Sequence, residues 1–234
     1  MIDKAPSKIR SMFNRVAPRY DVINRILSFG IDVYWRYRVS RKVEVTDLFT
    51  YVDLATGTGD LLIQLMKSHP RIQNAVGIDL SEGMLSIQHS KLARYPFSQS
   101  VELIQRDLTQ TDLESGSANL ITIAFGIRNV DDKIAAIVEM ARILAPGGQL
   151  LILEFSLPQN SFIRALYLWY FRRILPRVGG WISGDYDAYR YLNESVESWI
   201  APSGMLRLMH DAGLIRTEAI PLTFGIATLY SAYK

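Results

Sequence analysis

The sequence predicts an α/β fold with a doubly wound, mostly parallel sheet of about seven strands and an antiparallel C-terminal strand. Short apolar runs alternate with helical patterns from about residue 48 to residue 155, which favours parallel strands joined by right-handed crossovers. A loop with two glycines follows the first run and precedes a helical pattern. Two further runs near the C-terminus are separated by only a short turn, as antiparallel neighbours are.

The segments around these landmarks predict the individual elements. Apolar residues at i, i+3, i+4 and i+7 predict a helix from Ile9 to Val16. Two helical segments follow, and the second begins near Asp32, a residue type that can cap a helix. The expected strands span residues 48–54, 75–78, 101–105, 120–125, 149–155, 218–221 and 226–233. The expected later helices span residues 61–67, 82–93, 131–144, 162–169 and 205–212, with a break at Gly179-Gly180.

Length and composition favour one globular domain over residues 1–234, with a helical extension at 1–45 and a helical insertion at 157–200. Hydrophobic residues make up 49% and charged residues 21% of the chain, which excludes extensive disorder. Cysteine is absent, so disulfides, thiolate metal sites and cysteine nucleophiles are excluded. No long apolar run or hydrophobic leader is present, so a cytoplasmic protein is expected. A net charge of +3 permits contact with the inner face of an anionic membrane.

Glycines and acids at the predicted strand ends indicate a nucleoside site. In doubly wound sheets, ligands bind at the carboxyl ends of strands, and Gly57 and Gly59 allow close approach of the backbone. Asp79 and Asp107 end the second and third expected strands, where acids can accept hydrogen bonds from ribose hydroxyls. A dinucleotide fingerprint requires glycine or alanine where Leu62 stands. A nucleoside without a pyrophosphate, such as S-adenosyl-L-methionine, fits better.

Three of these segments resemble the motifs of class I S-adenosylmethionine-dependent methyltransferases, which have a Rossmann-like fold. They are residues 53–60, Gly77-Ile78-Asp79 and Ala145-Pro146-Gly147-Gly148. The resemblance implies S-adenosyl-L-methionine as cofactor. The expected cofactor-binding residues are Tyr20, Asp53, Gly57, Thr58, Gly59, Asp79, Asp107, Leu108 and Ala124.

A narrower resemblance covers nearly the whole chain. Residues 20–35 and 142–156 resemble the two motifs of the ubiquinone/menaquinone biosynthesis C-methyltransferase family, and residues 125–130, 186–195 and 223–234 also match. The chain departs from that family at Asp32, where histidine is usual, and at Trp199-Ile200, where Phe-Pro is usual. The resemblance implies C-methylation of a prenylated 1,4-quinol ring, with demethylmenaquinol favoured over a ubiquinone precursor.

Candidate catalytic residues follow the fourth expected strand and occupy the insertion. Arg128 is expected to stabilise a quinol phenolate or to position a proton-accepting water; the alternative is a surface ion pair. Asn129 would orient the acceptor or cap the next helix. Tyr186 lies beside Asp185, Tyr189 and Tyr191, which can hydrogen-bond a quinol or simply pack. No metal is expected, because the three histidines lack ligand spacing and stand away from the strand ends.

Several alternatives stay open at this stage. Residues 162–177 are aromatic and contain four arginines and no acid, which suits either a membrane surface or a core-facing helix. A homodimer is compatible with the sequence. A methyltransferase for an amine or a phenol oxygen is the main rival function, and a non-catalytic scaffold is another. A nucleic-acid methyltransferase is disfavoured, because no Asn/Asp-Pro-Pro-aromatic motif follows the fourth strand.

Overall fold

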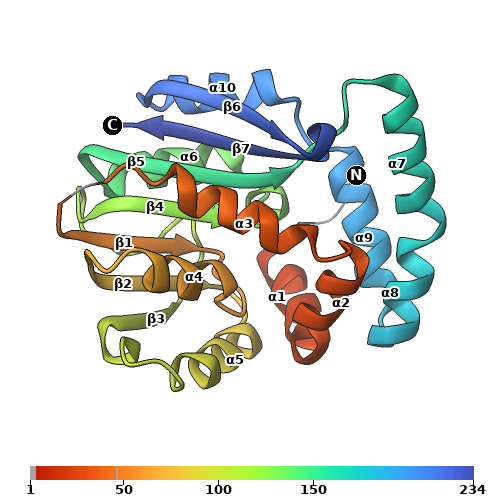
Figure 1. The fold of residues 1–234 in the computed structure, drawn as a ribbon, viewed down its shortest axis with the longest axis horizontal. Coiled ribbons are helices and arrows are strands. Elements are labelled where there is room, and N and C mark those ends of the chain that lie inside the picture. The colour runs from red at the N-terminus through yellow and green to blue at the C-terminus, as the bar shows by residue number, and fades with distance from the viewer. Residues whose placement is uncertain (1–3, 46) are drawn as a thin grey trace.

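A seven-stranded sheet runs through the centre of the molecule (Figure 1). The computed structural model describes residues 4–45 and 47–234. The strand order is β3-β2-β1-β4-β5-β7-β6. The first five strands of this order are parallel, and β7 is antiparallel to both of its neighbours. The strands are β1 (Phe49–Leu54), β2 (Ile72–Asp79), β3 (Val101–Gln105), β4 (Ala118–Ala124), β5 (Leu144–Phe155), β6 (Ile215–Leu222) and β7 (Ala227–Tyr233).

Apolar cores lie on both faces of the sheet, because the central strands are buried on both sides. Every residue from Leu150 to Leu153 on β5 is at most 1% exposed. One face packs against α6 (Lys133–Ile143) and α10 (Pro202–Asp211). The other packs against α3 (Ile31–Lys42), α4 (Asp60–Ser68) and α5 (Glu82–Leu92). This burial explains the continuous apolar runs of the sequence.

A layer of helices covers the carboxyl ends of the parallel strands, at the right in Figure 1. It combines α1 (Pro6–Val16) and α2 (Tyr20–Leu27) with α7 (Ser161–Arg173), α8 (Leu175–Ser183) and α9 (Tyr186–Glu197). Residues from both segments share one apolar cluster, among them Ile23, Tyr167, Phe171 and Val196. The N-terminal extension and the insertion therefore form one roof over the strand ends.

Two local predictions are wrong. Gly179 and Gly180 do not break a helix but lie inside α8. A Cβ atom on Gly179 would lie 2.5 Å from the Tyr189 ring, so the glycines permit close packing of α8 against α9. Asp32 does not cap α3, because Gly30 occupies the N-cap with φ 76° and Asp32 lies within the first turn. Among the described residues, no helix combines the length and the hydropathy needed to cross a bilayer.

Candidate active site

Two cavities meet under the helical roof. The strand-end cavity has a volume of about 280 Å³ and lies over β1–β4, where it is lined by Gly57, Asp79 and Asp107. The helical cavity has a volume of about 390 Å³ and lies between the N-terminal extension and the insertion. Three aromatic residues line both cavities: Phe13, Tyr20 and Phe125. Ligands bound in the two cavities would therefore both contact these three side chains.

The strand-end cavity contains most of the residues expected to hold the cofactor. Asp79 ends β2, and its carboxylate accepts hydrogen bonds from the backbone N–H groups of Gly57 and Ser81, both at 2.8 Å. These two bonds fix the carboxylate and leave lone pairs for a ligand's hydroxyl groups. Burial raises the pKa of Asp79 above its ordinary value. Gly57 has φ 57°, and nothing lies within 4 Å of where its Cβ would be, so the backbone there is open to a ligand.

The third and fourth strands complete this wall. Asp107 follows β3, and its Oδ1 accepts hydrogen bonds from the backbone N–H and the hydroxyl of Thr109, at 2.9 and 2.7 Å. Leu108 and Ala124 add apolar surface to the same lining. Tyr20 reaches this cavity from α2, and burial raises the pKa of its phenol. Its hydroxyl therefore stays protonated near neutral pH.

Three predicted cofactor residues lie outside the lining of both cavities and support the loop instead. Asp53 is 1% exposed and accepts hydrogen bonds from the hydroxyls of Thr56 and Thr122. Burial raises its pKa to about 6. The Thr58 hydroxyl donates to Asp21 on α2. Gly59 has φ 81°, and a Cβ there would lie 2.5 Å from the Gln88 side chain, so this position requires glycine.

Arg128 lies in the helical cavity and not at the surface. Its residue is only 4% exposed, and Nη1 donates to Glu154 Oε1 at 2.8 Å. The backbone N–H of Arg128 donates to Glu154 Oε2 at 3.2 Å. The guanidinium carbon lies 5.3 Å from the centre of the Phe155 ring. The expected alternative, a surface ion pair, is therefore wrong: the ion pair is buried.

Sequence reasoning overlooked Glu154 as a site residue. It lies near the end of β5 with 0% exposure, at the same edge of the sheet as Asp79 and Asp107. The signal that could have found it is an acid at the carboxyl end of a buried parallel strand, the rule that selected the other two.

The other two catalytic candidates, Asn129 and Tyr186, lie in different surroundings: one lines a cavity and the other does not. Asn129 lines the strand-end cavity, and its Oδ1 accepts a hydrogen bond from the Tyr191 hydroxyl at 3.1 Å. It does not cap the next helix, because Asp132 does so by accepting from Ala135 N at 2.9 Å. Tyr186 is 52% exposed and lines neither cavity. Tyr189 and Tyr191 line the helical cavity in its place.

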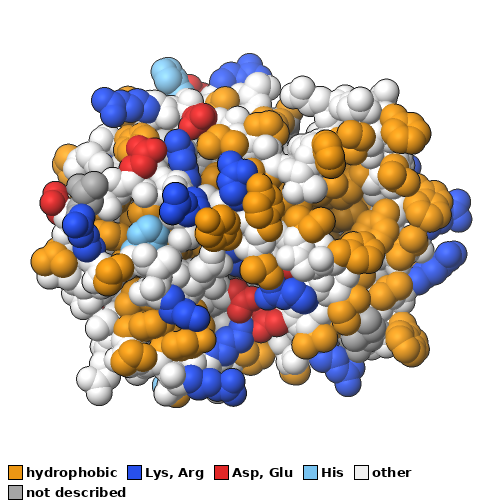
Figure 2. Space-filling model, viewed as in Figure 1, with side chains coloured by type: hydrophobic (Ala, Val, Ile, Leu, Met, Phe, Trp, Pro, Cys, Tyr) orange, Lys and Arg blue, Asp and Glu red, His pale blue; other side chains and the backbone are white. Residues whose placement is uncertain are grey.

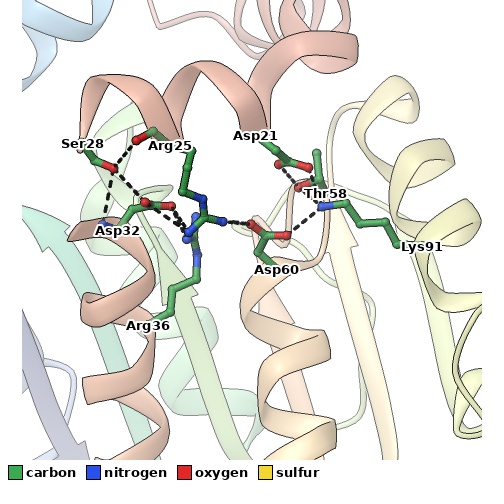
Figure 3. Close-up of polar contacts among 8 residues, drawn as sticks. All are labelled: Asp21, Arg25, Ser28, Asp32, Arg36, Thr58, Asp60 and Lys91. Carbon is green, nitrogen blue, oxygen red and sulfur yellow. Dashed lines mark hydrogen bonds and ion pairs between the residues drawn. The ribbon is translucent and has the colours of Figure 1, made fainter. Parts of the chain in front are cut away.

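A chain of charged groups ties the roof to the cofactor loop (Figure 3). Asp32, 5% exposed, accepts from Arg36 Nη1 at 2.6 Å and from the Ser28 hydroxyl at 2.7 Å. Burial alone would raise the pKa of Asp32, but these bonds outweigh it and lower the pKa. The network continues through Arg25, Asp60, Lys91, Asp21 and Thr58. It joins α2 and α3 to the loop after β1 and to α5.

Comparisons with known sequences identify the family of this chain. The model of the ubiE/COQ5 methyltransferase family matches residues 1–234. A Syntrophotalea carbinolica protein named ubiquinone/menaquinone biosynthesis C-methyltransferase UbiE is 43% identical, over 96% of this chain and 93% of its own. A Thermus thermophilus protein named demethylmenaquinone methyltransferase is 41% identical, over 94% of this chain and 98% of its own.

Solved structures share the fold. A Thermotoga maritima S-adenosylmethionine-dependent methyltransferase, described as a possible histamine N-methyltransferase, has a TM-score of 0.69 at 16% identity and covers 96% of this chain and 99% of its own. A Methanococcus maripaludis protein has a TM-score of 0.66 at 20% identity and covers 94% of this chain and 93% of its own. At such identities the likeness concerns the fold alone. The predicted fold class and family resemblance are both confirmed, and the chain belongs to the ubiE/COQ5 methyltransferase family.

Proposed function

We propose that this protein transfers a methyl group from S-adenosyl-L-methionine to a ring carbon of a prenylated 1,4-quinol, with demethylmenaquinol as the favoured acceptor. The names of the similar proteins support quinone biosynthesis, and the Thermus relative supports the menaquinone branch. The observation that carries the proposal is the junction of the two cavities at Phe13, Tyr20 and Phe125. A cavity that carries the Asp79 and Asp107 carboxylates at the strand ends there meets a larger and more apolar one.

The residues of the strand-end cavity fit the cofactor. The fixed Asp79 carboxylate suits the two ribose hydroxyls, and the open backbone at Gly57 suits close approach of the ligand. Asp107 and Leu108 line the same cavity after the third strand and would contact the adenine. Asp53, Thr58 and Gly59 would act by shaping the loop, because they lie outside the lining.

The helical cavity must make an unreactive aromatic carbon nucleophilic. A hydroquinone hydroxyl, like that of tyrosine, loses its proton near pH 10 in water, and ionisation enriches the adjacent ring carbon in electrons. Arg128 supplies a buried positive charge that favours the phenolate. When bound, S-adenosyl-L-methionine would supply an electrophilic methyl group, and the ring carbon that accepts it would give up its own proton to solvent. The hydrogen bond from the Tyr191 hydroxyl to Asn129 Oδ1 would fix these two side chains, one in the lining of each cavity.

A peripheral membrane contact through residues 162–177 suits a lipid-tailed acceptor. Phe162, Leu166 and Trp169 on α7 are 77%, 57% and 55% exposed, and their spacing of four and three residues puts them on one helix face. Figure 2 shows hydrophobic side chains gathered at the right of the molecule, where Figure 1 labels α7, with basic side chains at the edge. Leu166 and Trp169 also line the helical cavity, so the exposed face and the cavity mouth coincide. The prenyl tail would leave through this mouth.

The test uses purified protein, S-adenosyl-L-methionine with a deuterated methyl group, and a demethylmenaquinol with a short prenyl chain. Mass spectrometry should find one deuterated methyl in the product, and acetylation should still modify both hydroxyls, because C-methylation leaves them free. A product with a single acetylatable hydroxyl would establish O-methylation and overturn the proposal. The absence of any methylated quinol, with the cofactor bound, would overturn it as well.

A further inference from the structure

Two polar atoms in the helical cavity have no hydrogen-bond partner among the described residues. They are Nε of Arg128 and the hydroxyl of Tyr167. Both residues line the cavity, and they are only 4% and 7% exposed. Buried donors in proteins are normally paired, so an unpaired one calls for an explanation. Two in the same apolar cavity point to a ligand that supplies the missing acceptor.

A chain of aromatic contacts connects the two residues that carry these donors. The Tyr167 ring lies 4.4 Å from the Phe171 ring, centre to centre. Phe171 in turn contacts Phe155 edge-on at 6.1 Å, and the Arg128 guanidinium lies over Phe155. The charges of Arg128 and Glu154 both act on the Tyr167 phenol. Arg128 enters the lining of this cavity from the turn after β4, and Tyr167 enters it from α7.

Both groups can donate a hydrogen bond near neutral pH. Arginine remains protonated in proteins and has no acceptor atom. Burial raises the pKa of Tyr167 well above its ordinary value, so its hydroxyl keeps its proton. Nη1 of Arg128 already donates to Glu154, whereas Nε is buried without a partner among the described residues. An ionised oxygen has lone pairs enough to accept from both donors at once, so the site suits such an oxygen.

We propose that Tyr167 and Arg128 Nε form a two-donor site for one ring oxygen of the acceptor, which they bind as the phenolate. The inference rests on the proposed function and adds Tyr167, a residue that sequence reasoning did not select. Other tyrosines of the cavity are already engaged. The Tyr170 hydroxyl donates to Leu27 O at 2.8 Å, and that of Tyr191 donates to Asn129 Oδ1.

The critical variant is Tyr167→Phe, and the control is Tyr186→Phe, a half-exposed tyrosine of the insertion that lines neither cavity. The probe is a 4-nitrophenol carrying a short prenyl chain, whose phenolate is yellow. Wild type and Tyr186→Phe should lower the pKa of the bound nitrophenol, and Tyr167→Phe should lower it less. The kcat/KM for the short-tailed quinol should fall roughly 10- to 150-fold in Tyr167→Phe, as for the loss of one hydrogen bond to a charged group. Cofactor affinity should not change.

Stability separates this role from a structural one. Tyr167→Phe removes an unpaired buried hydroxyl, so the thermal midpoint of the ligand-free variant should equal or exceed that of wild type. Tyr170→Phe loses a hydrogen bond and should melt lower. A lower midpoint for Tyr167→Phe, or a nitrophenol pKa equal to that in wild type, would overturn the inference. If wild type lowers the nitrophenol pKa through Tyr167 but methylates no quinol, the donor site stands and the proposed substrate fails.

Discussion

The buried ion pair between Arg128 and Glu154 makes a quantitative prediction. The Glu154 carboxylate accepts three hydrogen bonds, from Arg128 Nη1 at 2.8 Å, Arg128 N at 3.2 Å and Phe155 N at 2.9 Å. Glutamine has almost the same size but no charge and one acceptor oxygen. Glu154→Gln therefore leaves the Arg128 charge buried without its counter-charge, and breaking such a pair costs about 3–5 kcal/mol. That is a large part of the roughly 5–15 kcal/mol that stabilises a typical protein.

The assay is urea unfolding at neutral pH, followed by circular dichroism. Glu154→Gln and Arg128→Met should each lower the free energy of unfolding by about 3–5 kcal/mol. The double variant should lose less than the sum, because neither charge is then left unpaired. Asp112→Asn is the control, since the exposed pair of Arg106 and Asp112 should contribute about 0–1 kcal/mol. If the two single losses simply add in the double variant, Glu154 does not hold Arg128 and the reasoning fails.

Three further predictions concern the cofactor, the acceptor and acid stability. Asp79→Ala should weaken cofactor binding measured by calorimetry, by about 1.5–3 kcal/mol for each ribose hydrogen bond lost; unchanged affinity in a folded variant would exclude Asp79. Arg128→Ala should lower turnover on the order of 10²- to 10³-fold at nearly constant cofactor affinity. Turnover of this variant should partly recover as the pH approaches the pKa of the quinol, and Arg128→Lys should recover part of the loss. Equal falls in turnover and in cofactor affinity would contradict this role. Hydrogen bonds from Arg142 and Thr111 lower the pKa of Glu139 from 4.5 to about 2. Its contribution of up to about 3 kcal/mol, less the screening at the partly exposed Arg142, should be present above pH 5 and disappear as pH falls toward 2. Urea titrations of wild type and Glu139→Gln should therefore converge in acid, and a constant difference would refute the assignment.

The fold and the strand-end cavity could be predicted because their signals are local. Asp79 and Asp107 each end a short apolar run, and parallel strands bring such ends to one edge whatever the rest of the chain does. Periodicity located most elements for the same reason but not all of their bounds: β2 begins at Ile72 and not at residue 75, β5 begins at Leu144 and not at residue 149, and α9 was not predicted as a helix. Gly179 and Gly180 show where local signals fail: a glycine pair usually breaks a helix, and only the contact with α9 explains why these two lie inside one.

The acceptor side depends on contacts between distant segments. Tyr186 and Tyr191 are five positions apart, which is about 140° around a helix, so they point to different sides. Only the packing of α9 decides which one reaches the cavity. Tyr167 was missed because its partner charges stand on other segments, at Arg128 and Glu154. Nothing in the local sequence distinguishes its hydroxyl from that of Tyr170.

The exposed apolar residues of the helical cavity give the proposed membrane contact a kinetic consequence. Phe29, Leu166 and Trp169 line this cavity and are 79%, 57% and 55% exposed. If they contact a bilayer as proposed, an acceptor dissolved in it would enter without crossing water. Its effective concentration is then its mole fraction among the lipids, and not its amount per litre. Vesicles with extra inert lipid at constant total quinol should slow the bound enzyme, in the pattern of surface dilution. A soluble short-tailed quinol should escape this dependence, because it reaches the same mouth from water.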